Sequence, residues 1–286
     1  MSNNAKGLII TSIGVLIMSL ESLFIKLTTI NSLTFSFYLG IFMFCSMAFT
    51  MLIKQRDKIK SIAKNSFSIL LFSAFLMGSS NILFITAIKS TTVANVVLIF
   101  GTAALFASFF AFLIYKEKIG KNILLASFFM MMGLFVIFSD SLDLGNLRGN
   151  IYALLCTISF SLSFVLLSKY TNISRVALTA ITGILISLIS YILSDGIIID
   201  INNLLIIAFM GLLITPIARV LMGNGTKYIN ASEVTLLMII ETLMAPVWVW
   251  IFLKEIPNSN TFLGGSIILV TLVINSIYTL SKKELA

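Results

Sequence analysis

The sequence predicts an all-α integral membrane protein with ten transmembrane helices, arranged as two inverted five-helix repeats. Three observations predict this fold class: a very apolar composition, ten long apolar segments, and a sequence pattern that returns after 138 residues. Of the 286 residues, 59% are hydrophobic and only 10% are charged, whereas about 25% of residues in soluble globular proteins are charged. Such a chain has too few charged side chains to cover itself in water, which indicates that lipid surrounds it.

The residue types that are absent or rare argue against several classes of protein. The chain has no histidine, and its two cysteines, Cys45 and Cys156, each lie within an apolar segment. A disulfide framework, a zinc site and a histidine-activated nucleophile are therefore unsupported. We expect no metal, no cofactor and no enzymatic activity.

Each expected span follows from the length of helix that crosses the hydrocarbon core, which is about 20 apolar residues. The first apolar run has the outline of a signal peptide. However, no convincing cleavage site follows it, and Glu21 and Lys26 lie where it should end, so an uncleaved helix is favoured. No segment is left over that could fold into a soluble catalytic domain. The ten expected spans are 7–26, 33–53, 66–88, 93–115, 122–139, 149–169, 176–194, 203–224, 232–253 and 261–280.

The distribution of lysine and arginine predicts the orientation. With ten spans both termini lie on one side of the membrane, and 14 of the 19 Lys and Arg residues lie on that side. Arg219 lies within a span, and the opposite side has four: Lys26, Lys89, Arg148 and Lys254. By the positive-inside rule we expect both termini in the cytoplasm and the protein in a bacterial inner (plasma) membrane. This topology also accounts for the net charge of +8, so we expect no nucleic-acid partner.

The fourth and ninth expected spans end alike, in ASFFAFLIYKE at residues 107–117 and in APVWVWIFLKE at residues 245–255. The same shift of 138 residues aligns Lys89 with Lys227, without a gap between. Apolar runs also align by chance, so the lysines and the two Lys-Glu pairs carry most of the signal. We interpret the alignment as an internal repeat.

The repeat units are expected in residues 1–142 and residues 143–286, within one membrane domain. Because each unit has five spans, an odd number, the second unit enters the membrane from the opposite side and the two are inverted. Inverted repeats recur in secondary transporters, since one structure can then open to either side around a site near the midplane. The repeat therefore predicts transport by alternating access.

Three short motifs carry a family resemblance: YKEKIGKN after the fourth span, LKEIPNSN after the ninth, and GGSIILVTLVI early in the tenth. With ten spans in two halves, they resemble the EamA family of the drug/metabolite transporter superfamily over nearly the whole chain. The proline expected in the ninth span is Pro246, whereas the fourth has Ser108 at the matching position. The resemblance implies an exporter or importer of amino acids, nucleobases, other metabolites or drugs. Glu117 and Glu255 are expected to be structural, capping the next helix or pairing with a nearby lysine.

Three ionisable residues are expected inside spans, where charges are costly and mark either a pathway or a pair. Glu21 lies in the outer part of the first span, Arg219 in the inner part of the eighth, and Glu241 nearly halfway along the ninth. One interpretation is a fixed internal ion pair, or side chains that reach an interface. The other is that at least one glutamate faces a central cavity and exchanges a proton as the cavity opens to alternate sides.

Further candidates for substrate binding are Trp248, Asn81 and Asn95. Trp248 follows Glu241 at helical spacing, so a carboxylate and an indole would face one space and suit a cationic or amphiphilic substrate. The alternative for Trp248 is an anchor at the membrane interface, which is the role expected for Trp250. Asn81 and Asn95 can bind a substrate or a neighbouring helix, and neither role is favoured.

The sequence thus predicts a secondary transporter that exports a small metabolite or amphiphilic compound, with protons as the candidate coupling ion. Pro216 and Pro246 interrupt backbone hydrogen bonding in the eighth and ninth spans and are expected to form kinks where helices rock. The lipid bilayer is the expected surrounding, and a monomer or a homodimer is the expected transport unit. The alternative is a membrane scaffold or receptor-like component that transports nothing, and the inverted repeat argues against it.

Overall fold

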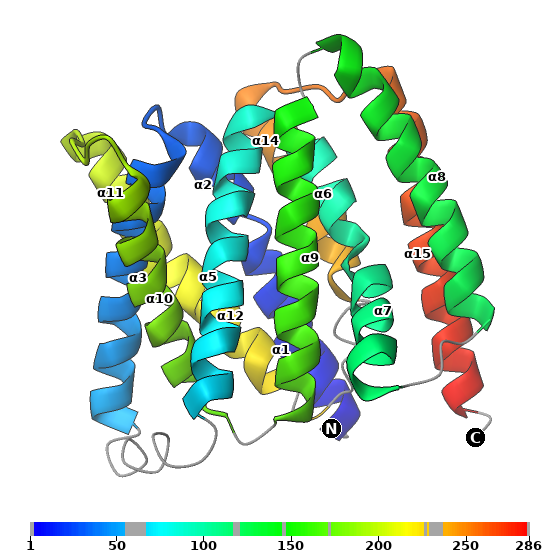
Figure 1. The fold of residues 1–286 in the computed structure, drawn as a ribbon, viewed down its shortest axis with the longest axis horizontal. Coiled ribbons are helices and arrows are strands. Elements are labelled where there is room, and N and C mark those ends of the chain that lie inside the picture. Colours follow the sequence, from blue (N-terminus) through cyan, green and yellow to red (C-terminus); the bar gives the residue numbers. More distant parts are fainter. Residues whose placement is uncertain are drawn as a thin grey trace.

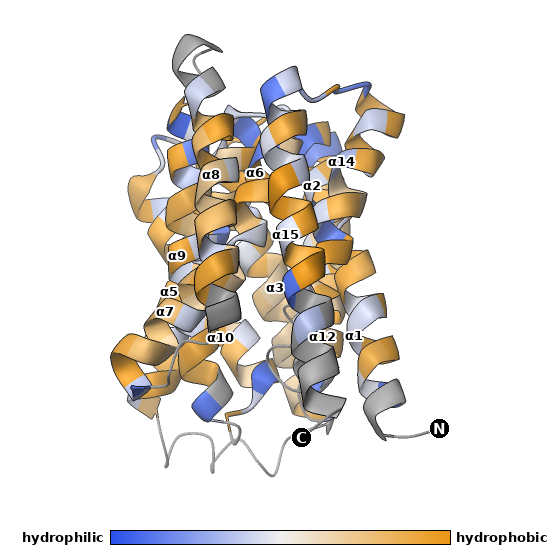
Figure 2. Ribbon diagram, turned by 90° about the vertical axis from the view of Figure 1, so that its right-hand side faces the viewer, coloured by the Kyte–Doolittle hydropathy of each residue, from blue (hydrophilic) through white to orange (hydrophobic). Residues whose placement is uncertain are grey.

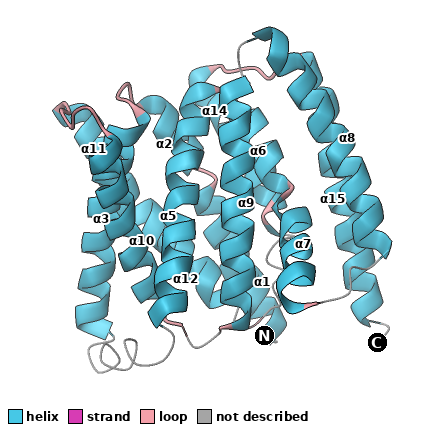
Figure 3. Ribbon diagram, in the orientation of Figure 1, coloured by secondary structure: helices cyan, strands magenta, loops and turns pink. Residues whose placement is uncertain are grey.

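The chain forms a bundle of helices in the computed structural model (Figure 1). The structure describes residues 3–54, 67–116, 121–144, 147–170, 173–225, 228 and 237–284, and these ranges contain helices and loops but no strand (Figure 3). The all-α prediction is therefore confirmed for the described residues. The helices are α1 (Asn3–Met18), α2 (Glu21–Leu27), α3 (Ser32–Lys54), α5 (Phe67–Ser90), α6 (Val93–Gly101), α7 (Ala103–Tyr115), α8 (Lys121–Leu144), α9 (Leu147–Lys169), α10 (Arg175–Leu193), α11 (Ile201–Phe209), the π-helical turn η2 (Met210–Ile214), α12 (Thr215–Gly225), α14 (Ile239–Leu253) and α15 (Ser259–Glu284).

The helices have the length and composition of membrane spans. Within the described residues, seven helical segments are long and apolar enough to cross a bilayer, and three further apolar helices are shorter: Leu124–Ser139, Ile239–Leu253 and Ser259–Asn275. Apolar residues cover the middle of the helices, and hydrophilic residues gather mostly at the two ends of the bundle (Figure 2). The protein is therefore a multi-pass membrane protein, while ten crossings remain a prediction. α1 begins and α15 ends at the same end of the bundle (Figure 1).

Three of the expected spans are broken inside the bundle. The first is interrupted at Ser19 and Leu20, between α1 and α2, and the fourth at Thr102, between α6 and α7. The eighth consists of α11, η2 and α12. The breaks in the first and fourth spans are not expected from the sequence, because hydropathy carries no sign of them. In the eighth span Pro216 is expected to interrupt the helix, and the π-helical turn lies just before it.

Pro216 explains the π-helical turn in the eighth span. A proline has no N–H, and its ring clashes with the carbonyl four residues earlier, which here belongs to Leu212. The chain bulges at η2, so that the N–H of Thr215 reaches back to the carbonyl of Met210. The carbonyl of Leu212 instead accepts a 2.8 Å hydrogen bond from the hydroxyl of Ser46 on α3. A neighbouring helix thus satisfies the freed backbone group, as the interior of a membrane protein requires.

Helix α6 lies at the centre of the core. All of its residues 93–100 are buried, and α6 packs against α5, α9, α14 and α15. At its end the hydroxyl of Thr102 donates a 2.6 Å hydrogen bond to the carbonyl of Ile99. Just beyond, the carbonyl of Ala103 accepts a 3.0 Å hydrogen bond from Ser161 on α9. The break therefore has hydrogen-bond partners despite its depth.

The helices pack in pairs that the 138-residue shift interchanges. α1 packs against α12 as α9 packs against α5. α3 packs against α10 at one edge of the bundle and α8 against α15 at the other, and each of these pairs contains two helices that the shift aligns (Figure 1). Lys116 and Lys254, which the shift also aligns, both end a helix in the left-handed conformation with φ of 57°.

In two of these pairs, the two helices approach each other closely at glycines. A Cβ atom on Gly40 would lie 2.5 Å from the carbonyl oxygen of Gly183, and one on Gly264 would lie 2.6 Å from that of Gly133. Any side chain at these positions would meet the opposite backbone. Small residues at such crossings let membrane helices pack closely, here α3 on α10 and α8 on α15.

Candidate functional site

Two buried glutamates mark the candidate site. Glu21 is the first residue of α2, immediately after the break in the first span, and Glu241 lies in the first turn of α14. Their exposed fractions are 4% and 2%. Carboxyl groups are almost never buried this deeply unless they are paired or functional. The sequence-based expectation that both lie inside the protein is met in the structure.

Arg219 on α12 lies close enough to interact electrostatically with both carboxyl groups, and the two carboxyl groups interact with each other. The described contacts contain no ion pair between Arg219 and either glutamate. A fixed internal ion pair, one of the two interpretations of the sequence, is therefore not formed in this structure. The structure does bring all three predicted ionisable residues together, from α2, α12 and α14.

Several polar atoms in this cluster are buried without a hydrogen-bond partner among the described residues. They are Oε1 of Glu21, Oε2 of Glu241, Nε of Arg219 and Oγ1 of Thr215, although the Thr215 hydroxyl lies close enough to the Glu21 carboxyl group to interact with it. Buried polar groups are nearly always hydrogen-bonded, and exceptions concentrate at functional sites. Thr215 follows η2 directly and precedes Arg219 by four residues, about one helical turn. Thr215 is not predicted from the sequence, because one threonine in an apolar run gives no signal.

Trp248 connects α14 to the break in the first span. Its indole Nε1 donates a 2.9 Å hydrogen bond to the hydroxyl of Ser19, and that hydroxyl donates a 2.7 Å hydrogen bond to the carbonyl of Leu16. Ser19 precedes Glu21 by two residues, so Trp248 bonds a side chain next to this glutamate in the chain. By contrast, 54% of Trp250 is exposed on the outside of the bundle.

The two asparagine candidates differ in their partners. Asn95, in the first turn of α6, donates hydrogen bonds to Thr91 and to Asn150 on α9, and it accepts one from Thr261 on α15. Through these hydrogen bonds, Asn95 connects α6 to α9 and α15. Asn81 is buried in α5, and its Oδ1 has no partner within the described part of the chain. Of the two, Asn81 has the freer side chain.

The loop that follows α14 and contains Glu255 lies at the end of the bundle opposite the chain termini (Figure 1). The carboxylate of Glu255 pairs with Nζ of Lys26 at 3.0 Å and accepts a 2.7 Å hydrogen bond from the backbone N–H of Val93. The expected lysine partner is thus Lys26, and the helix that Glu255 caps is α6. The next helix, α15, is capped by Asn258, which accepts from the N–H of Thr261. Glu117 lies outside the described residues.

A small pocket adjoins the break in the fourth span. It lies between the break that separates α6 from α7 and the start of α14. Thr242, one of its lining residues, directly follows Glu241 in the chain. Its lining is apolar apart from one hydroxyl and consists of Phe100, Gly101, Ala103, Ala104, Met238, Ile239, Thr242 and Leu272. Thr242 uses its hydroxyl to bond the carbonyl of Met238 at 3.3 Å.

The chain is similar to transporters along much of its length. A protein named "Uncharacterized transporter YdfC" from Bacillus subtilis is 29% identical over 185 residues, which cover 62% of this chain and 60% of the relative. A protein named "Uncharacterized transporter" from Clostridium kluyveri is 25% identical over 214 residues, or 69% of this chain and 67% of that protein. The chain therefore spans about three fifths of the length of the Bacillus relative and two thirds of the Clostridium relative.

The fold is shared with a protein of known structure. A crystal structure superposes on this chain with a TM-score of 0.70 at 13% identity, over 96% of this chain and 98% of the other. The sequence model of the EamA-like transporter family matches residues 5–139 and again residues 147–277. The resemblance seen in the sequence is thereby confirmed, and the protein belongs to the EamA-like transporter family.

Proposed function

We propose that the protein is a secondary transporter that works by alternating access around Glu21, Arg219 and Glu241. The observation that carries this proposal is the cluster of two buried glutamates with the partly buried Arg219, which has polar atoms without a hydrogen-bond partner among the described residues. The three residues come from both halves of the chain, where a site that opens to alternate sides is expected. Ionisable side chains inside a membrane protein are costly, and a scaffold that transports nothing would have no use for them.

The proposal that the halves are inverted repeats rests on three observations. The family model matches each half separately. The packing of α1 on α12 repeats that of α9 on α5, and helices aligned by the shift pair with each other. Lys116 and Lys254 have the same left-handed backbone. Because five is an odd number, five crossings in each half would place the two halves in opposite orientations, as in transporters that work by alternating access.

The charges of the cluster indicate the chemistry of the cargo. Two carboxyl groups share one guanidinium group, so one negative charge is left for a proton or for a cationic group of the substrate to balance. Trp248 supplies an aromatic surface next to the break that holds Glu21. Asn81 on α5 is a separate buried candidate, and its carbonyl oxygen has no partner in the described part of the chain. The cluster thus suits a small metabolite or an amphiphilic compound with a positive group.

Export coupled to proton entry is the transport cycle we propose. A proton taken up from outside by Glu21 or Glu241 would release a cationic substrate there, and loss of that proton to the cytoplasm would let the next substrate bind. The two ligands compete for one negative charge, which is the simplest form of coupling between them. Both termini are cytoplasmic in this proposal, on the basis of the lysine and arginine distribution.

The experiment is transport by the purified full-length protein in liposomes. A panel of radiolabelled amino acids, nucleobases, amines and amphiphilic cations is tested with and without a pH gradient. We expect saturable movement of at least one compound that carries a positive group, and faster movement with a gradient. A panel in which no compound moves faster than in empty liposomes contradicts the proposal and favours a scaffold without transport.

A further inference from the structure

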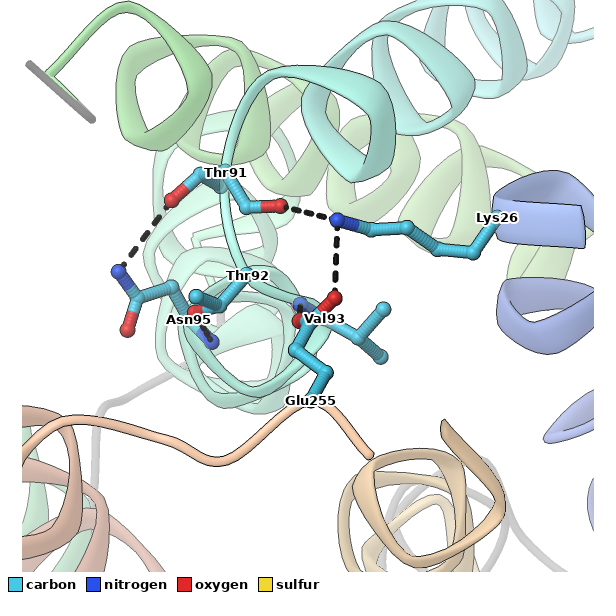
Figure 4. A network of polar contacts seen from close by, with 6 residues as sticks. All are labelled: Lys26, Thr91, Thr92, Val93, Asn95 and Glu255. Carbon is cyan, nitrogen blue, oxygen red and sulfur yellow. Dashed lines mark hydrogen bonds and ion pairs between the residues drawn. The ribbon is translucent and has the colours of Figure 1, made fainter. Parts of the chain in front are cut away.

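Four residues at the end opposite the termini form one cluster, which we name the Lys26–Glu255 latch. It consists of the side chains of Lys26 and Glu255 with the backbone of Thr91 and Val93 (Figure 4). Lys26 Nζ lies 3.0 Å from Oε2 of Glu255 and donates a 3.0 Å hydrogen bond to the carbonyl of Thr91. Oε1 of Glu255 accepts a 2.7 Å hydrogen bond from the N–H of Val93.

The latch joins the two halves of the chain. Glu255 follows α14 in the second half, whereas Lys26 ends α2 and Val93 begins α6 in the first half. A single carboxylate therefore holds the loop between α14 and α15 onto two helices of the other half. Separation of the halves at this end requires both oxygens of Glu255 to lose their partners.

The surroundings make Glu255 the natural partner for this position. The N-terminus of α6 carries a partial positive charge and free N–H groups, which favour a carboxylate. The other nearby cation, Lys89, is used elsewhere: its Nζ donates hydrogen bonds of 2.9 and 3.0 Å to Thr28 and lies 5.6 Å from the ring centre of Phe35. Glu255 is thus the described carboxylate that neutralises Lys26.

The latch and the buried site share the short helix α2. Glu21 and Lys26 are both on α2, and a rise of 1.5 Å per residue separates them by about 7.5 Å along the helix axis. Ser22 lies one turn before Lys26 on the same face of α2. Ser22 is only 1% exposed, and its hydroxyl has no partner in the described residues. Along α2, Lys26 therefore lies between Glu21 and the end of the helix where Glu255 is bound.

The geometry points to a gate: the Lys26–Glu255 latch closes the transport route on the side opposite the chain termini, and it separates when the route opens there. This inference rests on the proposed transport by alternating access. Lys26 and Glu255 are both about one-fifth exposed, at 22% and 23% of their side-chain surface. A partly exposed ion pair is weak enough to break during a cycle and strong enough to shift the balance of states.

A cysteine reporter tests the gate without any cargo. Ser22→Cys is introduced into a full-length chain that carries Cys45→Ala and Cys156→Ser, and a membrane-impermeant maleimide is added from the side opposite the termini. Ile198→Cys, at a residue that is 94% exposed in the α10–α11 loop of the same end, verifies the side of labelling. Glu255→Gln and Lys26→Gln are each compared with the unaltered pair.

We expect the labelling rate of Ser22→Cys to rise about fivefold in Glu255→Gln and in Lys26→Gln, since each removes an ion pair of the partly exposed kind. Lys26→Arg keeps the charge, and Asp195→Asn neutralises an exposed carboxylate at the same end, so both should label at the rate of the unaltered pair. The gate is refuted by unchanged labelling in both glutamine variants, or by equal rises in Lys26→Arg. Where Glu255→Gln fails to fold, as judged by gel filtration, Lys26→Gln decides alone.

The two proposals fail in different experiments. Labelling of Ser22→Cys requires no substrate, so unchanged rates contradict the gate while transport in liposomes still stands. A compound panel without transport contradicts the proposed function, whatever the labelling rates are.

Discussion

The indole of Trp248 donates a hydrogen bond of 2.9 Å to the hydroxyl of Ser19, across 229 residues of sequence. Ser19 lies at the break between α1 and α2, just before Glu21. This bond fixes α14, which carries Glu241, to the backbone that carries the other glutamate. The hydrogen bond from Nε1 of Trp248 therefore connects the segments that carry the two glutamates of the candidate site.

Trp248→Phe keeps an aromatic ring and removes this bond. We expect a loss of about 1 kcal/mol in the free energy of unfolding, because the Ser19 hydroxyl loses a buried donor. Thermal unfolding in detergent measures the loss. Trp250→Phe is the matched control, since Trp250 is 54% exposed, and equal melting temperatures for the two variants would contradict the role assigned to Trp248.

Ser46 and Pro216 should be coupled through the carbonyl of Leu212. Ser46→Ala leaves this carbonyl without its 2.8 Å donor, which should cost about 0.6 kcal/mol, a typical value for a side-chain hydrogen bond between membrane helices. In a Pro216→Ala background the backbone N–H of residue 216 can return to Leu212, so the same change should cost less. A double-mutant cycle of unfolding free energies measures the difference, and strict additivity would count against the assignment.

Gly40→Ala should be strongly destabilising. The added Cβ would lie 2.5 Å from the carbonyl oxygen of Gly183, so α3 and α10 would have to move apart. Overpacking of this kind costs about 1–3 kcal/mol. Gly196→Ala is the control, because a Cβ there meets no atom within 4 Å. Similar thermal unfolding curves in detergent for both variants would show that the crossing of α3 and α10 accepts a larger residue, and would contradict this prediction.

Arg219→Gln should destabilise the protein by about 3 kcal/mol, because it leaves two buried carboxyl groups without a cation nearby. Adding Glu21→Gln to this variant should recover part of the loss, since only one carboxyl group then remains. Arg148→Gln, at an exposed position in α9, should change the free energy of unfolding by less than about 0.5 kcal/mol. A double variant no more stable than Arg219→Gln alone would show that the two groups do not interact.

Composition and hydropathy were enough to predict a helical membrane protein, and the rarity of charge within spans singled out Glu21, Arg219 and Glu241 as candidates. These properties are local, because each residue or window is judged against the bilayer alone. The breaks at Ser19 and at Thr102 are not predicted, because their partners come from distant helices: Trp248 bonds the Ser19 hydroxyl, and Ser161 bonds the carbonyl of Ala103 next to Thr102. A run of apolar residues has the same appearance with or without such partners.

Glu255 illustrates what spacing can and cannot predict. Its Lys-Glu motif indicated an ion pair and a helix cap near the membrane edge. The actual partners, Lys26 and Val93, lie 229 and 162 residues away in the chain. Only the packing of α2 and α6 against the α14–α15 loop brings them together.

Proton-driven transport by a Glu21→Gln, Glu241→Gln double variant tests the central claim most directly. In liposomes loaded with a compound that the unaltered protein transports, we expect the pH gradient to speed its movement by the unaltered protein and to have no effect on the double variant. The variant should still elute as a folded protein, because a glutamine amide has nearly the same shape as a carboxyl group. Movement that follows the gradient equally in both proteins would contradict the assignment of coupling to these two residues.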